Sequence, residues 1–213
     1  MKHLLLVWLL LGLMEHAWSQ NSTNSIFLFE KFTNAYVYYR DGRVFQVPIN
    51  YDLFKEKFIF LDKDQAENEF SDPDMVVSVK IGERTFLAVG GGNMAELIQQ
   101  EPRILVQYSG SKRIQKNLTY GGKTETAAVD SYSTLKSGTS SNMKVGDDIF
   151  LGNMDYEYYL EVNGKLKHFS TEKQFLKIFS SQRDKLQMYI KENKIDFNAV
   201  DQVLKLCNYA LSL

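Results

Sequence analysis

The chain has 213 residues, of which 44% are hydrophobic and 24% are charged, and its formal net charge is −1. This composition is typical of a folded globular protein, and a near-neutral chain lacks the basic surface that attracts nucleic acid. A single cysteine excludes an internal disulfide. We therefore expect no nucleic-acid partner and no disulfide-stapled fold.

The N-terminus follows the three-part pattern of a secretory signal. Lys2 supplies a positive start, residues 4–14 form a nearly unbroken apolar run, and Ala17 and Ser19 are the small residues that precede a cut before Gln20. The alternative is a membrane anchor, which requires about 20 apolar residues. No second run of that length follows, so we expect a mature chain without a transmembrane span.

Cleavage of this signal peptide, residues 1–19, has consequences for metal chemistry and for location. It removes His3 and His16, so that His168 and Cys207 are the only imidazole and thiol of the mature chain. A His/Cys zinc site takes three or four such ligands, so we expect no metal or other cofactor. Because small animal extracellular modules are usually disulfide-rich, we expect a bacterial envelope protein that is periplasmic, extracellular or outer-membrane associated.

Beyond a polar tail at residues 20–25, tight turns between alternating apolar residues predict three β-hairpins. Their turns are Asp41-Gly42, Gly82-Glu83 and Asn163-Gly164. The first predicts Tyr38 opposite Phe45 and Tyr36 opposite Val47. The second predicts one apolar face, made of Val77, Val79, Ile81, Phe86 and Ala88. Residues 57–61 and 104–108 predict further strands.

Residues 110–155 are rich in Ser, Thr, Gly, Asn and Asp, with sparse aliphatic residues. This composition predicts a long irregular excursion over the sheet, with one or two short strands, and long loops of this kind are usually functional or mobile.

From residue 170 the apolar period becomes helical, which predicts three helices. Thr171 with Gln174 predicts a capping box for the first helix, Ser181 with Asp184 starts the second, and Asn198 with Asp201 caps the third. The expected buried residues are Phe175, Leu176, Phe179, Leu186, Tyr189 and Ile190, followed by a stripe of Val200, Val203, Leu204, Cys207, Ala210 and Leu211.

These elements predict an α+β fold: an antiparallel, hairpin-rich sheet or partial barrel over about 35–169, then three helices over about 171–212. We expect residues 20–213 to form a single domain, with a β-rich part (27–169) and a helical cap (170–213). Two domains divided near 155–170 are the alternative.

Four local features resemble chemical motifs, and each also has a plain structural interpretation. His168 is a candidate general base, but opposite Tyr159 it is better interpreted as a cross-strand packing partner. Residues 117–124 approach a phosphate-binding loop through Gly122, Lys123 and Thr124, but Asn117 replaces the first glycine and no clear helix follows.

The other two features are a glycine cluster and an acidic segment. Residues 89–93 lack the spacing of a dinucleotide-binding turn, which favours a flexible turn or bulge. Residues 62–69 carry Asp62, Asp64, Glu67 and Glu69 but not the fifth- and sixth-position residues of a calcium loop, which favours a solvated acidic turn.

Tyrosines and the cysteine complete the candidates. Tyr36, Tyr38, Tyr39, Tyr156, Tyr158 and Tyr159 lie on predicted strands, where they are ordinary packing residues unless an exposed ring stacks on a sugar. Cys207 lies on the apolar stripe of the last helix and is expected to be a buried small hydrophobe.

The hairpin followed by NYDLFKEKFIFLD, then IGERTF and RILVQYSG, resembles an uncharacterised family of exported proteins from Gram-negative bacteria. KTETAAVDSY (123–132) and the tail at 175–206 are similar to the same family. The resemblance covers nearly all of residues 30–213. It implies an envelope location and single-unit architecture, and it transfers no site residue.

No nucleophile, metal or phosphate motif is established, so no catalytic, cofactor-binding or metal-ligating residue is assigned. We hypothesise a non-enzymatic interaction or ligand-binding module whose partner is an envelope protein or a glycan. A hydrolase of glycans or peptides that uses two carboxylates, roughly 5 to 9.5 Å apart, is the alternative because such a pair leaves no local motif. A structural accessory of an outer-membrane complex is a third hypothesis.

Overall fold

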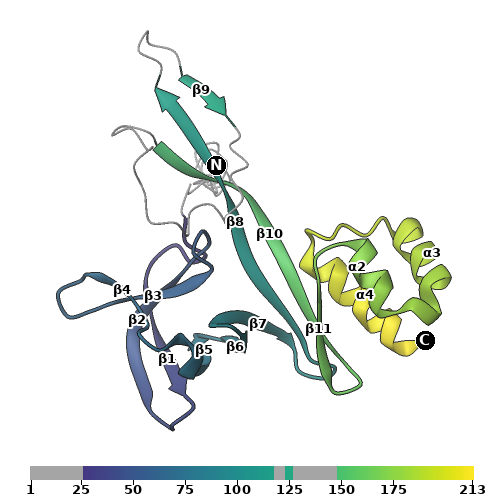
Figure 1. The fold of residues 1–213 in the computed structure, drawn as a ribbon, viewed down its shortest axis with the longest axis horizontal. Helices are drawn as coiled ribbons and strands as arrows, with labels where there is room; N and C mark the ends of the chain where they lie inside the picture. Colours follow the sequence, from purple (N-terminus) through teal and green to yellow (C-terminus); the bar gives the residue numbers. More distant parts are fainter. Residues whose placement is uncertain (1–25, 118–122, 127–147) are drawn as a thin grey trace, which may run out of the picture.

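The computed structural model describes residues 26–117, 123–126 and 148–213, which form one antiparallel sheet followed by three α-helices (Figure 1). The predicted α+β class is therefore confirmed. The strands follow the order β11-β10-β8-β7-β6-β5-β1-β2-β3-β4, and β9 pairs with β8.

The sheet strands are β1 (Thr33–Tyr39), β2 (Val44–Asp52), β3 (Lys57–Leu61), β4 (Glu67–Glu69), β5 (Val76–Ile81), β6 (Arg84–Gly90), β7 (Asn93–Gln99), β8 (Ile104–Asn117), β9 (Lys123–Thr126), β10 (Asp148–Val162) and β11 (Lys165–Phe169). The helices are α2 (Glu172–Ile178), α3 (Arg183–Asn193) and α4 (Val200–Ser212), with short 3₁₀ turns η2 (Pro73–Met75) and η4 (Ser180–Gln182).

The sheet curls so far that the β2–β3 turn reaches β8, although four strands separate β2 from β8 in the sheet. The Gly110 N–H donates to the Leu53 carbonyl over 2.9 Å, and the Tyr51 hydroxyl donates to the Tyr108 carbonyl over 3.0 Å. A Cβ on Gly110 would lie 2.4 Å from Leu151 Cδ1 and 3.2 Å from Leu53 Cβ. Glycine therefore permits this close approach.

One continuous buried cluster lines the inside of the curl and extends under the helices. Within the curl, Phe86 packs edge-on against Phe58 with ring centroids 5.1 Å apart. At the other end, Phe169 of β11 stacks on Tyr158 and packs against Phe175 of α2. Figure 1 shows the consequence: β8 and β10 run as a long pair between β1–β4 and the helices.

Two of the three predicted hairpins have the predicted register. Ile81 pairs with Arg84, and Gly82 alone of the two turn residues has positive φ, as a type II′ turn requires. Asn163 and Gly164 have φ of +53° and +70°, as a type I′ turn requires, and they place Tyr159 opposite His168 as predicted.

The register predicted for the Asp41-Gly42 hairpin is wrong by one residue. The Tyr39 N–H donates to the Arg43 carbonyl, which leaves a three-residue loop with Gly42 at φ +88°. Such loops follow a type I turn with a left-handed glycine, and a D-G dipeptide satisfies both geometries. The observed pairs are Tyr36 with Gln46, Val37 with Phe45, and Tyr38 with Val44.

The apolar face predicted for the second hairpin is correct at Val79, Ile81 and Phe86 and wrong at Val77 and Ala88, which are exposed. The β1–β5 pairing shifts so that Ser78 and Val76 face successive residues of β1, and Val77 is the bulged residue between them. A second register shift follows Ala88 in the β6–β7 pair. The bulge at Val77 changes which face its side chain occupies, and local alternation does not reveal it.

The long irregular excursion predicted for residues 110–155 is wrong at both ends. β8 continues to Asn117 and β10 begins at Asp148, and the two strands pair from Gln115 and Asp148 down to Ile104 and Leu160. The polar composition concealed this ladder because backbone pairing does not itself require apolar side chains. The rest of that prediction falls on residues 118–122 and 127–147, which lie outside the described residues.

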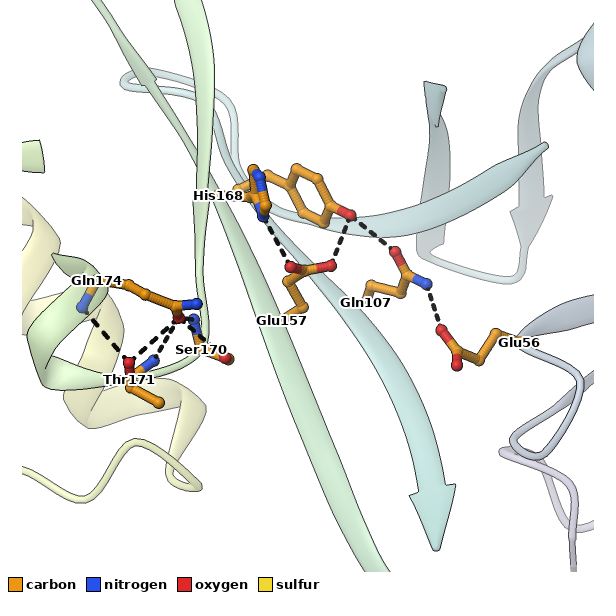
Figure 2. Close-up of polar contacts among 8 residues, drawn as sticks. Glu56, Gln107, Glu157, His168, Ser170, Thr171 and Gln174 are labelled. Carbon is orange, nitrogen blue, oxygen red and sulfur yellow. Dashed lines mark hydrogen bonds and ion pairs between the residues drawn. The ribbon is translucent and has the colours of Figure 1, made fainter. Parts of the chain in front are cut away.

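The Thr171 and Gln174 capping box is confirmed, with both reciprocal hydrogen bonds formed (Figure 2). The other two predicted caps are wrong. Helix α3 begins after Gln182, because η4 intervenes, and α4 begins after Ala199 without a side-chain cap.

The predicted buried residues of the helices are largely correct. Leu186, Ile190, Val203, Cys207 and Ala210 are buried. In α4, however, Leu206 is buried and Leu211 is exposed, which rotates the buried stripe relative to the prediction. Within the described part of the chain, no helix is long and apolar enough to cross a membrane.

Candidate functional site

The inner face of the curled sheet opens to the surface at one end. Alternate residues of β2 point to this face, and they grade from Tyr51 and Ile49, both 0% exposed, through half-buried Val47 to Phe45, which is 42% exposed. A groove of about 340 Å³ lies at this opening, lined by Tyr39, Arg43, Phe45, Val47, Phe60, Phe70, Ser71 and Asp72. We call it the aromatic groove.

Aromatic rings from four segments form the walls of the aromatic groove. Tyr39 meets Phe45 edge-on with centroids 5.3 Å apart, and it meets Phe70 at 6.3 Å. Phe60 stacks on Phe70 at 5.2 Å. Tyr39, Phe60 and Phe70 also pack against the core, and Phe45 is supported by Tyr39, so the walls do not consist of isolated exposed side chains.

Arg43, the residue that directly follows the loop between β1 and β2, supplies a cation to this surface. The Arg43 guanidinium lies 5.0 Å from the Tyr39 ring centre and 5.8 Å from that of Phe45. Asp41 accepts from the Arg43 backbone N–H and from Nε, the latter over 2.7 Å, which orients the side chain. Asp72 adds a carboxylate to the lining.

This combination suits a ligand with one flat apolar face and polar groups at its rim. Ligand pockets are mostly apolar, start near 300 Å³, and carry a few polar groups that set orientation. Burial, only partly offset by the Arg43 charge, raises the pKa of Tyr39 above its usual value, so its hydroxyl stays neutral and able to donate.

Two other hollows differ from the aromatic groove. One of about 30 Å³, beside Phe58 and Phe70, has room for roughly one water molecule. The other is polar, about 330 Å³, and contains Glu101, Arg103 and Glu161, with Arg103 Nε 3.7 Å from Glu161 Oε2.

His168 belongs to a separate polar network on the face of β8, β10 and β11 that carries Gln107, Glu157 and Tyr159 (Figure 2). Its Nδ1 is 2.8 Å from Glu157 Oε1, and its ring stacks on Tyr159 with centroids 6.0 Å apart. The predicted cross-strand packing is confirmed, and the acidic partner is an addition that the sequence did not suggest.

The remaining motif candidates have structural roles. The end of β8 pairs with β9, with Asn117 opposite Lys123. Lys123 and Thr124 therefore lie in a strand, whereas a phosphate-binding loop would place them at the start of a helix. Residues 118–122 lie outside the described residues. Gly90, Gly91 and Gly92 all have positive φ in the β6–β7 turn, which confirms the turn interpretation of residues 89–93.

In the acidic segment 62–69, one Asp62 oxygen accepts the backbone N–H groups of Asp64 and Ala66, and the other accepts from the Asn68 amide. The carboxylate therefore orders its own turn. Among the residues that the structure describes, no three His, Cys, Asp or Glu side chains lie close enough to hold a metal ion.

The tyrosines divide between the two faces of the sheet. Tyr39 enters the aromatic groove, whereas Tyr36, 46% exposed, lies on the opposite face of β1, and Tyr158 is buried. Cys207 is buried as predicted, and burial raises its thiol pKa to about 12, which keeps it unreactive.

Sequence reasoning missed most of the groove and most of the network. Phe70 and Asp72 follow the short strand β4, and Glu56 lies in a turn, where no local pattern marks them. The one sequence feature that could have indicated the polar network is Glu157, a charged residue among tyrosines in YEYY (156–159).

Comparisons with protein-family models, with curated proteins and with solved structures find no match to this chain.

Proposed function

We propose that this chain is an exported, non-enzymatic binding module and that the aromatic groove is its ligand site. The observation that carries the proposal is the opening of the core into a preformed groove of about 340 Å³, walled by Tyr39, Phe45, Phe60 and Phe70. The signal-like pattern of residues 1–19 supports export to the bacterial envelope.

The ligand class that fits best is a glycan of that envelope. Sugar rings present flat C–H faces to aromatic side chains, and their hydroxyl groups suit Arg43, Asp72 and the Tyr39 hydroxyl at the rim. A partner protein that inserts an aromatic or aliphatic side chain is the competing occupant.

Replacing Phe45 with alanine is expected to weaken glycan binding at least tenfold, which corresponds to about 1.4 kcal/mol. Phe45 is the most exposed aromatic wall and touches Tyr39 and Arg43, so its removal flattens the groove while most of the core is retained. Binding of soluble peptidoglycan and lipopolysaccharide fragments is measured by calorimetry and by amide chemical shifts.

The matched control is Tyr36→Ala, which removes an equally exposed ring from the opposite face of the same hairpin. It is expected to leave affinity unchanged. Equal losses in both variants, or shifts that avoid the groove, would contradict the site. Binding at the groove to an envelope protein, but to no glycan, would show that the ligand is a protein and would leave the groove as the binding site.

Export is tested separately by cell fractionation and N-terminal sequencing. The expected mature protein begins at Gln20 and is found outside the cytoplasm. A cytoplasmic protein that retains Met1 would refute export without bearing on the groove.

A carboxylate hydrolase remains the second candidate because Glu101 and Glu161 share the polar hollow of about 330 Å³. The Arg103 ion pair with Glu161 favours a structural role for that carboxylate. Hydrolysis of envelope glycans or peptides that disappears in both Glu101→Gln and Glu161→Gln would establish this alternative.

A further inference from the structure

Strand β2 has an open edge beside the aromatic groove. It pairs with β1 along most of its length but with β3 only from Ile49 to Asp52. Residues 44–47 therefore have β1 on one side and, among the described residues, no strand on the other. The first three of these residues are exposed, so the edge is open to solvent.

The backbone groups of this edge point away from β1. The Tyr39 N–H donates to the Arg43 carbonyl, and the register then continues without a shift. In an antiparallel pair only alternate residues bond to the partner strand, so Val44, Gln46 and Pro48 face outward. Val44 and Gln46 thus present two N–H groups and two carbonyl groups that bond to no other residue in the described part of the chain.

Pro48 explains why β3 does not cover this edge. Its nitrogen faces β3 but carries no hydrogen, and the β2–β3 ladder stops at the next pair, Ile49 with Phe60. Within a sheet, proline occurs where its nitrogen would not have to donate to a neighbouring strand. The sequence itself therefore leaves residues 44–47 unpaired on this side.

The two outermost strands of the sheet carry features that prevent strand addition, and this edge does not. β11 carries Lys165 and Lys167, and β4 has only three residues, two of which are glutamates. Charges and short length are devices by which proteins protect sheet edges. Residues 44–47 read VFQV, without a charge or a bulge. The guanidinium of neighbouring Arg43 lies over the Tyr39 ring rather than along the edge.

We propose that the edge formed by residues 44–47 binds an extended segment of a partner protein as an added strand. Val44 and Gln46 supply the main-chain hydrogen bonds. A side chain of the segment that faces inward packs against Phe45 and Val47 at the mouth of the aromatic groove. The segment that fits this edge is uncharged and apolar at alternate positions.

This inference goes beyond the proposed glycan site and does not depend on it, because the hydrogen bonds come from the edge and not from the groove. An inward side chain at the mouth of the groove is expected to exclude a glycan from it. The partner segment and the glycan would then compete for the same module.

A second copy of this chain suits the edge less well than an extended segment does. A stable interface between two folded proteins takes roughly 20–30 residues from each side. The edge offers only the four residues 44–47. An extended segment needs no more than main-chain hydrogen bonds and side-chain contacts at alternate positions.

The probe is a capped hexapeptide of alternating threonine and phenylalanine, titrated into the purified protein and followed by amide chemical shifts. Two isomers of it carry N-methyl groups, one on the threonines and the other on the phenylalanines. Only alternate N–H groups of an added strand face β2, so one isomer is expected to bind roughly tenfold more weakly than the other. The shifts are expected to centre on Val44 and Gln46.

Val44→Lys introduces at this edge the charge that β11 carries, and it is expected to weaken the unmethylated peptide roughly tenfold. Val44 is 51% exposed, so the variant retains the fold. The matched control is Tyr36→Lys, which places the same charge on β1 opposite Gln46, where β2 separates it from the edge. The control is expected to leave the affinity unchanged.

Equal binding of the two methylated isomers would overturn the proposal, because insertion of a side chain alone does not depend on which amides are methylated. Failure of the unmethylated peptide to bind at millimolar concentration would also overturn it. A dimer that Val44→Lys dissociates, detected by analytical ultracentrifugation, would overturn the partner segment in favour of a second copy.

The two proposed ligands fail separately. Glycan binding without peptide binding would overturn this inference and leave the glycan site intact. Peptide binding at Val44 and Gln46 without glycan binding would support this inference and reject only the glycan.

Discussion

Replacing Phe86 with alanine is expected to lower the free energy of unfolding by about 3–5 kcal/mol. Phe86 is 0% exposed and lies at the centre of the curl, with its ring 5.1 Å from Phe58 and 6.4 Å from Tyr51. It also meets Phe29 at 6.2 Å. The substitution leaves a cavity among three rings that close the curl, so the surrounding structure cannot easily collapse onto it.

The matched control is Phe45→Ala, the same chemical change at a ring that is 42% exposed. It is expected to cost less than about 1 kcal/mol, because much of that ring already contacts water. Phe86→Leu should fall between the two. Urea denaturation monitored by fluorescence and circular dichroism measures all three, and equal costs for Phe86→Ala and Phe45→Ala would contradict the assigned core.

Replacing Glu96 with leucine is expected to cost about 3 kcal/mol, because it leaves Arg84 without its partner. Arg84 Nε and Nη2 lie 2.7 and 2.6 Å from the two Glu96 oxygens, and the Tyr108 hydroxyl also donates to Glu96. The Arg84 guanidinium is surrounded by the rings of Phe29, Phe86 and Tyr108. Its side chain is 35% exposed, so water limits the penalty.

The double variant Arg84→Met with Glu96→Leu is expected to regain most of this loss, because it leaves no unpaired charge. The exposed pair of Lys55 and Glu69 is the control, and Glu69→Leu should cost no more than about 1 kcal/mol. A double variant as unstable as Glu96→Leu would indicate that the ion pair itself, rather than the unpaired cation, determines the effect.

Burial together with Glu96 raises the pKa of the Tyr108 phenol, which therefore remains a hydrogen-bond donor throughout the ordinary pH range. The hydrogen bond that Tyr108 donates within this cluster is thus expected to persist when the pH changes near neutrality.

Local sequence determined the elements whose geometry depends on a few adjacent residues. Gly82 and Asn163-Gly164 permit the positive φ values of tight turns, and they set the two hairpin registers that were predicted correctly. Thr171 and Gln174 cap α2 for the same reason, since their partners are each other's backbone groups. The change of apolar period after residue 170 determined the α+β class.

Only the tertiary structure decided the bulge at Val77, the long β8–β10 ladder, the aromatic groove and the polar network through Gln107 and Tyr159. Glu56 and Gln107 are 51 residues apart, and the Gln107 and Tyr159 side chains are separated by 52. The Gln107–Tyr159 contact follows from the pairing of β8 with β10, whereas Glu56 reaches Gln107 only because the sheet curls, and the curl is held by packing among rings such as Phe58 and Phe86. Such long-range contacts have no local pattern, because each arises from the sum of many strand pairings rather than from neighbouring residues.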